Sequence, residues 1–162
     1  MPIVQASPAC VECADQEKKP LVLCIDDDPA VLSALRRLLR TEPYEVVTVA
    51  SPGQAWESLL RRPVAVVISD ERMPEASGTA LLAAVRERWP RIGLVILTGY
   101  PDRDLRMRGQ NAGIDRLVSK PWKSESLKRA VCWLVDRVER ARGVSQEGAE
   151  QGSGCDLDGE GG

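Results

Sequence analysis

The sequence predicts an α/β protein: a doubly wound parallel sheet of five strands, packed between five helices. Short apolar runs alternate with segments whose apolar residues recur at helical spacing along most of the chain. The run at 64–68 is continuously apolar and mostly β-branched, which is typical of a strand buried on both faces. Polar residues follow several of these runs, at the strand ends where open α/β sheets place their ligands.

Composition excludes several classes of protein. The 162 residues carry a net charge of −2 and are 43% apolar, which suits one core and gives no global indication of nucleic-acid or membrane binding. His is absent, so histidine triads and histidine metal sites are excluded. No apolar run approaches the roughly 18 residues of a membrane span. The N-terminus lacks the pattern of a signal peptide.

The five cysteines indicate a reducing compartment, and we therefore expect a cytoplasmic protein. Cys24 and Cys132 lie in apolar segments and are expected in the core. Cys10 and Cys13 have the spacing of a metal or redox pair, but no second pair and no His completes a zinc site. We interpret them as an incidental pair in the N-terminal segment, whose role the sequence leaves open.

The chain divides into three parts. We expect a flexible leader over 1–19, a folded domain over 20–142 and a disordered, acidic, Gly-rich tail over 143–162. In the domain, strands are expected at 21–25, 44–49, 64–69, 92–97 and 114–118. Helices are expected from Pro29, from Ser51, from Gly78 to Trp89, over 102–112 and from Ser124 to Arg142. This alternation favours the flavodoxin-like strand order 2-1-3-4-5.

Polar side chains end four of the strands, at one edge of the expected sheet. Asp26 and Asp27 end the first strand, Asp70 the third, Thr98 the fourth and Lys120 the fifth. Three packed carboxylates repel one another unless a cation joins them, and Mg²⁺ suits such ligands. A lysine and a hydroxyl can hold phosphoryl oxygens, and an aspartate so placed can attack phosphorus. Each residue alone could be a turn Asp, a capping Thr or a solvated Lys; their convergence favours a site.

Four motifs carry a family resemblance over about residues 20–140. They are Leu-Cys-Ile-Asp-Asp-Asp-Pro at 23–29, Ile-Ser-Asp-Glu-Arg-Met-Pro at 68–74, Ile-Leu-Thr-Gly-Tyr at 96–100 and Val-Ser-Lys-Pro-Trp at 118–122. In this order and spacing, the chain resembles the receiver domain of a two-component response regulator. The resemblance implies that Asp70 accepts a phosphoryl group from a histidine kinase or a phosphotransfer protein.

The resemblance also implies a role for each site residue. Asp27 and Asp70 would bind Mg²⁺ directly, Asp26 would act mainly through water, and the backbone carbonyl of Arg72 would add a ligand. Thr98 would bind a phosphoryl oxygen and move toward it. Lys120 would pair with the phosphoryl group, and its bond to Pro121 would be cis.

Two features depart from the family pattern or modify it. Receivers usually carry Tyr or Phe three residues before the lysine, where its rotation reports phosphorylation; here that residue is Leu117. The relay from Thr98 to an aromatic ring is therefore in doubt, although the chemistry at Asp70 does not need the ring. Arg72 and Tyr100 occupy positions that flank incoming water in the family. Both are bulky, so we predict slow loss of the phosphoryl group.

The leading interpretation is a stand-alone phosphoacceptor that signals by binding a downstream protein in trans, or passes the phosphoryl group onward in a phosphorelay. It would bind no DNA directly, and it would not be an enzyme beyond its own phosphorylation and slow dephosphorylation. Arg103, Arg106, Arg108 and Arg116 lie on the face that receivers use for partners, although a solvated basic rim is the simpler interpretation. One alternative is a receiver-like scaffold that is never phosphorylated. Another, a phosphohydrolase of the haloacid-dehalogenase type, lacks the threonine expected where this chain has Ala30.

Overall fold

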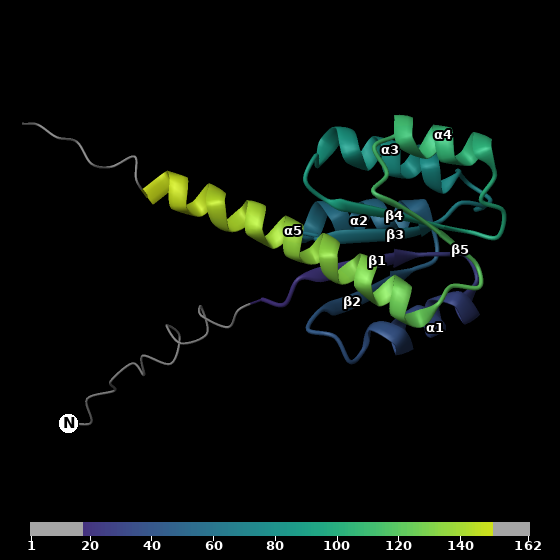
Figure 1. Cartoon of the computed structure of the whole chain (residues 1–162), viewed down its shortest axis with the longest axis horizontal. Coiled ribbons are helices and arrows are strands. Elements are labelled where there is room, and N and C mark those ends of the chain that lie inside the picture. The colour runs from purple at the N-terminus through teal and green to yellow at the C-terminus, as the bar shows by residue number, and fades with distance from the viewer. Residues whose placement is uncertain (1–17, 151–162) are drawn as a thin grey trace, which may run out of the picture.

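A five-stranded sheet forms the centre of the structure, a computed structural model that describes residues 18–150 (Figure 1). The strands lie in the order β2-β1-β3-β4-β5, and every neighbouring pair is parallel. They are β1 (Leu21–Ile25), β2 (Glu45–Val49), β3 (Val66–Asp70), β4 (Gly93–Thr98) and β5 (Arg116–Ser119). The predicted fold class and strand order are confirmed.

Five helices alternate with the strands, and local sequence sets where most of them begin. They are α1 (Pro29–Leu39), α2 (Pro52–Arg61), α3 (Gly78–Arg88), α4 (Arg103–Asn111) and α5 (Ser124–Glu150). The side chains of Asp28, Ser51, Ser77 and Asp102 each accept a backbone N–H from the first turn of the helix that follows. Such caps satisfy donors that a helix leaves open at its N-terminus.

The alternation of side chains along the central strands divides the core into two layers. Val22, Ile68 and Val95 face α1 and α5, whereas Leu23, Val67 and Leu94 face α2 and α3. β1, β3 and β4 are buried along their whole length, while β2 and β5 are partly exposed edge strands. Because the central strands are held on both faces, the residues at their carboxyl ends have fixed positions.

The structure corrects three details. α5 begins where predicted but continues to Glu150, so residues 143–150 of the predicted tail are helical; glycine weakens a helix by only about 1 kcal/mol and need not end it. Leu60 of α2 is exposed, because the apolar face of that helix is narrower than the sequence indicates. Cys132 is also exposed, whereas Cys24 is buried and its pKa is raised to about 12 by burial.

Other predictions fall outside the part of the chain that is described. The Cys10/Cys13 pair and residues 151–162 of the tail lie there. Between residues 18 and 150, no helix is both long enough and apolar enough to cross a membrane.

Candidate functional site

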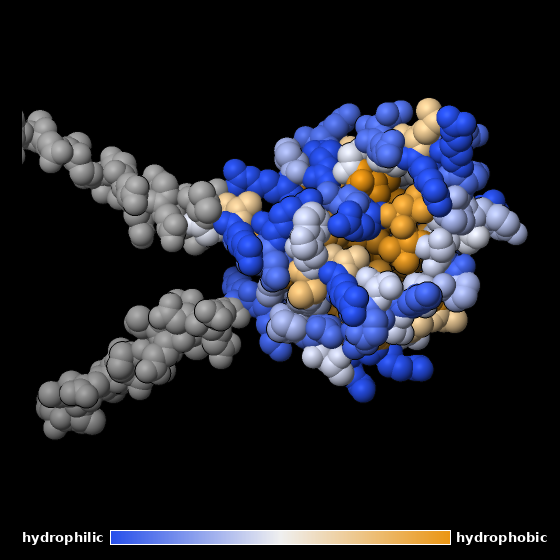
Figure 2. Space-filling view, in the orientation of Figure 1, coloured by the Kyte–Doolittle hydropathy of each residue, from blue (hydrophilic) through white to orange (hydrophobic). Residues whose placement is uncertain are grey.

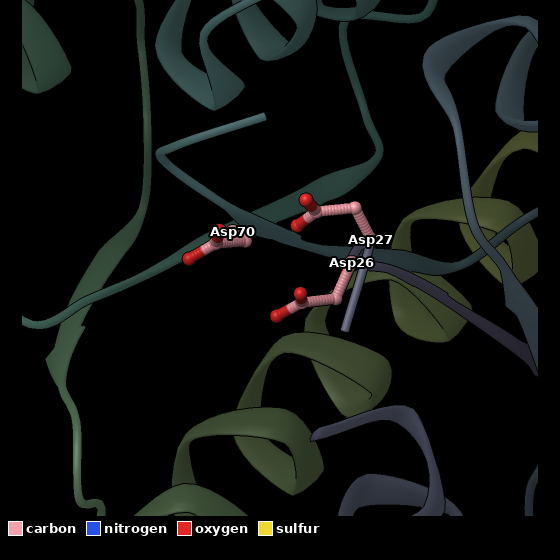
Figure 3. A group of neighbouring side chains, drawn as sticks. All are labelled: Asp26, Asp27 and Asp70. Atoms are coloured by element: carbon pink, nitrogen blue, oxygen red, sulfur yellow. The ribbon is translucent and has the colours of Figure 1, made fainter. Parts of the chain in front are cut away.

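Three carboxylates meet where β1 and β3 end. Asp26 and Asp27 follow β1, and Asp70 is the last residue of β3. Each aspartate contributes one carboxylate oxygen to a group of three that lie within 4.8 Å of one another. Asp26 and Asp70 are buried, whereas Asp27 is exposed. The three side chains gather on the same side of the strand ends (Figure 3).

Lys120 contacts two of these carboxylates, although it lies 94 positions from Asp26 and 50 from Asp70 in the sequence. Its Nζ donates to Oδ1 of Asp70 at 2.8 Å and to Oδ2 of Asp26 at 3.1 Å. The lysine directly follows β5, and its bond to Pro121 is cis, as the resemblance implied. Its backbone N–H donates to the carbonyl of Thr98 at 2.7 Å, which links the ends of β4 and β5.

Thr98 is the last residue of β4 and is buried. Its hydroxyl accepts the backbone N–H of Tyr100 at 3.1 Å. The hydroxyl hydrogen can still donate to another oxygen, since a threonine hydroxyl is both donor and acceptor. The structure therefore places Thr98 at the same edge of the sheet as the carboxylates.

The electrostatics of the site oppose the charge on Asp26. Burial raises the pKa of Asp26, and the charge of Asp70 adds to the rise, although hydrogen bonds from Asp28 N–H and Lys120 oppose it. Burial alone would lower the pKa of Lys120, but its bonds to Asp70 and Asp26 outweigh burial and raise the pKa. A charged lysine thus stands among carboxylates that still carry excess negative charge.

This donor set fits a hard divalent cation. Mg²⁺ prefers oxygen ligands and binds through one or two carboxylates, water and phosphate oxygens. The three aspartates supply such oxygens from both buried and solvent-facing positions. A bound cation would offset both the burial of Asp26 and the charge of Asp70, which together raise the pKa of Asp26.

Backbone contacts hold the loop after Asp70 close to α3. A Cβ atom on Gly78 would lie 2.2 Å from the carbonyl oxygen of Asp70, so only glycine allows this approach. The N–H of Gly78 donates to the carbonyl of Glu71 at 3.0 Å. The Glu71 carboxylate is buried and accepts the N–H of Thr79 at 2.9 Å and its hydroxyl at 2.6 Å.

Arg72 and Tyr100 come together beside the site. The guanidinium carbon of Arg72 lies 5.0 Å from the centre of the Tyr100 ring, within the range of a cation–π contact. Arg72 also lines a hollow with Asp27, Ser77 and Arg108. The predicted role of the Arg72 carbonyl as a metal ligand stays a prediction.

The region around Leu117 is partly open. Leu117 and Val118 of β5 are only partly buried. Figure 2 shows an apolar patch in a hollow between α4 and α5, where β5 crosses in Figure 1.

The four arginines on the face that receivers use for partners are all exposed: Arg103, Arg106, Arg108 and Arg116. Trp122 is partly buried and packs against the core on the side of α1 and α5.

One contact near Asp70 could not be predicted from the sequence. Arg108 of α4 donates to Glu71, which directly follows Asp70, although the two residues are 37 positions apart. A charged residue next to a buried strand was the available signal for Glu71, but no local pattern identifies Arg108 as its partner.

Comparisons with known proteins identify relatives of this chain. The model of the family described as response regulator receiver domain matches residues 22–132. The chain is 42% identical over 126 residues to the hydrogenase transcriptional regulatory protein HoxA of Cupriavidus necator, covering 77% of this chain and 24% of that protein. It is 34% identical over 126 residues to the transcriptional regulatory protein KdpE of Mycobacterium tuberculosis, covering 78% of this chain and 55% of KdpE. The chain thus spans about a quarter of HoxA and about half of KdpE.

Solved structures show the same fold. The signal receiver domain of an HD domain-containing protein from Pseudomonas fluorescens superposes with a TM-score of 0.73 at 31% identity, over 77% of this chain and 93% of that one. A CheY-like receiver domain protein from Methanospirillum hungatei gives a TM-score of 0.72 at 26% identity, over 76% of this chain and 98% of that one.

Proposed function

Because this chain belongs to the response regulator receiver family, we propose that Asp70 accepts a phosphoryl group in a reaction that depends on Mg²⁺. The observation that carries this proposal is the contact of one lysine with two members of the acidic cluster. Lys120 donates to Asp70 and Asp26, beside a third carboxylate that faces solvent. Membership of the family supports a histidine kinase or a phosphotransfer protein as the donor.

In the proposed step, a carboxylate oxygen of Asp70 forms a bond to phosphorus. The bond from phosphorus to the donor's imidazole nitrogen breaks, and the imidazole keeps the electron pair. Lys120 and the hydroxyl of Thr98 would stabilise charge on the phosphoryl oxygens. Mg²⁺, when bound by Asp27 and Asp70 with Asp26 acting through water, would neutralise negative charge on the carboxylates and the phosphoryl group.

We also propose that the phosphoryl group is lost slowly. The Arg72–Tyr100 contact brings together two large side chains from the loops that follow β3 and β4, and we expect them to hinder water on its way to the phosphorus. Replacing both by alanine should shorten the half-life of the aspartyl phosphate, followed by intact mass after the donor is removed. A half-life of seconds in the unmodified protein would contradict the proposal.

The output of the domain is proposed to be a change in the binding of another protein, after phosphorylation. The related HoxA and KdpE are transcriptional regulators, and this chain spans only part of each. Delivery of the output in trans, the absence of direct DNA binding and the cytoplasmic location therefore stay predictions.

Intact mass spectrometry after incubation with acetyl phosphate and Mg²⁺ tests the proposal. We expect a gain of about 80 Da, the mass of one phosphoryl group, in the unmodified protein and none in Asp70→Asn. Asp104→Asn, which changes an exposed aspartate on α4, is the matched control and should be modified normally.

Absence of both the mass gain and Mg²⁺ binding would favour the scaffold that is never phosphorylated. A mass gain that persists in Asp70→Asn would move the phosphoacceptor to another residue. Turnover of a phosphomonoester would instead favour the phosphohydrolase.

A further inference from the structure

We infer that the contact between Glu71 and Arg108 couples the phosphorylation state of Asp70 to helix α4. This inference rests on the proposed function, because it assumes that Asp70 is the residue modified. Receivers usually carry an aromatic residue where this chain has Leu117. We assign to Glu71 and Arg108 the regulatory role that such a residue would have.

Glu71 is a junction of four elements. It directly follows Asp70 at the end of β3, and its N–H donates to the carbonyl of Leu97 in β4 at 3.0 Å. Its carbonyl and carboxylate hold the first residues of α3, Gly78 and Thr79. Its other carboxylate oxygen, Oε1, accepts from Nη1 of Arg108 in α4 at 3.4 Å. The residue next to the proposed phosphoacceptor therefore contacts α4 directly.

The two ends of the ion pair differ in a way that suits a switch. The Glu71 side chain is 9% exposed and is held by Thr79, whereas the Arg108 side chain is 55% exposed. The distance of 3.4 Å is at the long end for a hydrogen bond, and a pair with one exposed partner is weak. Arg108 can therefore leave Glu71 when a stronger anion forms nearby, while Glu71 stays in place.

Phosphorylation would create such an anion. A phosphoryl group adds negative charge and three strong acceptor oxygens. Arg108 and Asp27 line the same hollow, so Arg108 lies on the side of the molecule where the acidic site opens. Drawing Arg108 from Glu71 toward this new charge would release one attachment of α4 to the sheet.

Hydrogen–deuterium exchange of α4 residues 103–111 tests the inference, measured with and without acetyl phosphate and Mg²⁺. In the unmodified protein we expect exchange in α4 to change by roughly threefold, the factor that suits the loss of one weak ion pair. The change should be absent in Arg108→Ala and reduced in Glu71→Gln, which keeps a side-chain oxygen for Thr79. Arg106→Ala is the control, because Arg106 is exposed on the same helix and no ion pair of it is found among residues 18–143, whose side chains are described.

Intact mass of the same samples separates failure of the inference from failure of the proposed function. No gain of mass in the unmodified protein would contradict phosphorylation itself. Full modification with no change in α4, or with equal changes in Arg108→Ala and Arg106→Ala, would overturn the coupling alone. Loss of modification in Arg108→Ala would place the arginine in phosphoryl transfer and also overturn the coupling.

Discussion

Asp26 lies at the carboxyl ends of the strands and Asp115 at their amino ends. The two residues show two outcomes of removing an aspartate from water. Their side chains are 2% and 14% exposed. Asp26 follows β1 among other carboxylates and shares one lysine with Asp70. Asp115 precedes β5 and accepts from Arg86 at 2.9 Å, from Arg137 at 2.8 Å and from the N–H of Leu94 at 2.8 Å.

The pKa values of the two residues move in opposite directions. Burial raises the pKa of Asp26, and its partners do not compensate. Burial would also raise the pKa of Asp115, but the bonds from Arg137 and Leu94 and the charges of both arginines outweigh it and lower the pKa. At the amino ends of the strands, a carboxylate with enough partners stabilises the fold. At the carboxyl ends, the carboxylates repel one another, and a bound cation can relieve that repulsion.

The largest expected effect is on Asp115. Asp115→Ala should lower the free energy of unfolding by about 2–3 kcal/mol, because it leaves two arginines and the Leu94 N–H without their shared partner. Urea denaturation measures this loss. Asp136→Ala, which changes an exposed aspartate on α5, should stay within about 0.5 kcal/mol of the unmodified protein. An equal loss of free energy of unfolding in the two variants would contradict the stabilising role of Asp115.

The carboxyl edge should respond to metal instead. Mg²⁺ at roughly ten times its Kd should raise the free energy of unfolding by about 1.4 kcal/mol, because it binds only the folded state. Asp27→Ala should remove most of this response, which denaturation with and without Mg²⁺ detects. Asp28→Asn is the control, since Asn caps α1 as well as Asp does. An unchanged response in Asp27→Ala would exclude Asp27 as a ligand.

A smaller gain in stability is expected when Asp26 loses its charge. Asp26→Asn should raise the free energy of unfolding by about 1 kcal/mol without Mg²⁺, the size typical of relieving strain at a functional site. An asparagine oxygen can still accept the Asp28 N–H, and Lys120 keeps Asp70. Denaturation measures the gain, with Asp28→Asn again expected to be neutral. A loss of stability would mean that the lysine contact outweighs the repulsion.

The pH dependence of stability sharpens the contrast further. The folded state lowers the pKa of Asp115, so the unfolded chain binds more protons there as the pH falls. Its stabilising contribution is present above the ordinary pKa of an aspartate and is lost as the pH falls through the lowered value. The free energy of unfolding, measured by denaturation between pH 7 and pH 3, should therefore fall less steeply with pH in Asp115→Asn than in the unmodified protein. Parallel curves would contradict this assignment.

Much of the fold could be predicted because its signals are local. The buried run that became β3, the apolar spacing of α1 and the caps at Asp28 and Ser51 lie within a few neighbouring residues. The convergence of Asp26, Asp70 and Lys120 also followed from the sequence, since the order of parallel strands brings their ends to one edge. The predicted end of α5 and the predicted burial of Leu60 and Cys132 were wrong, because they depend on how widely other elements cover each helix.

By itself, the sequence determined the class of fold, the edge that carries the chemistry and the residues that meet there. Only the tertiary structure decided which charges pair across the sheet: Asp115 with Arg86 and Arg137, and Glu71 with Arg108. The physical reason is that local patterns identify the strands and their order, which brings the strand ends together. Each of these ion pairs instead uses an arginine from a helix, Arg86 in α3, Arg108 in α4 or Arg137 in α5, and no local pattern identifies its partner.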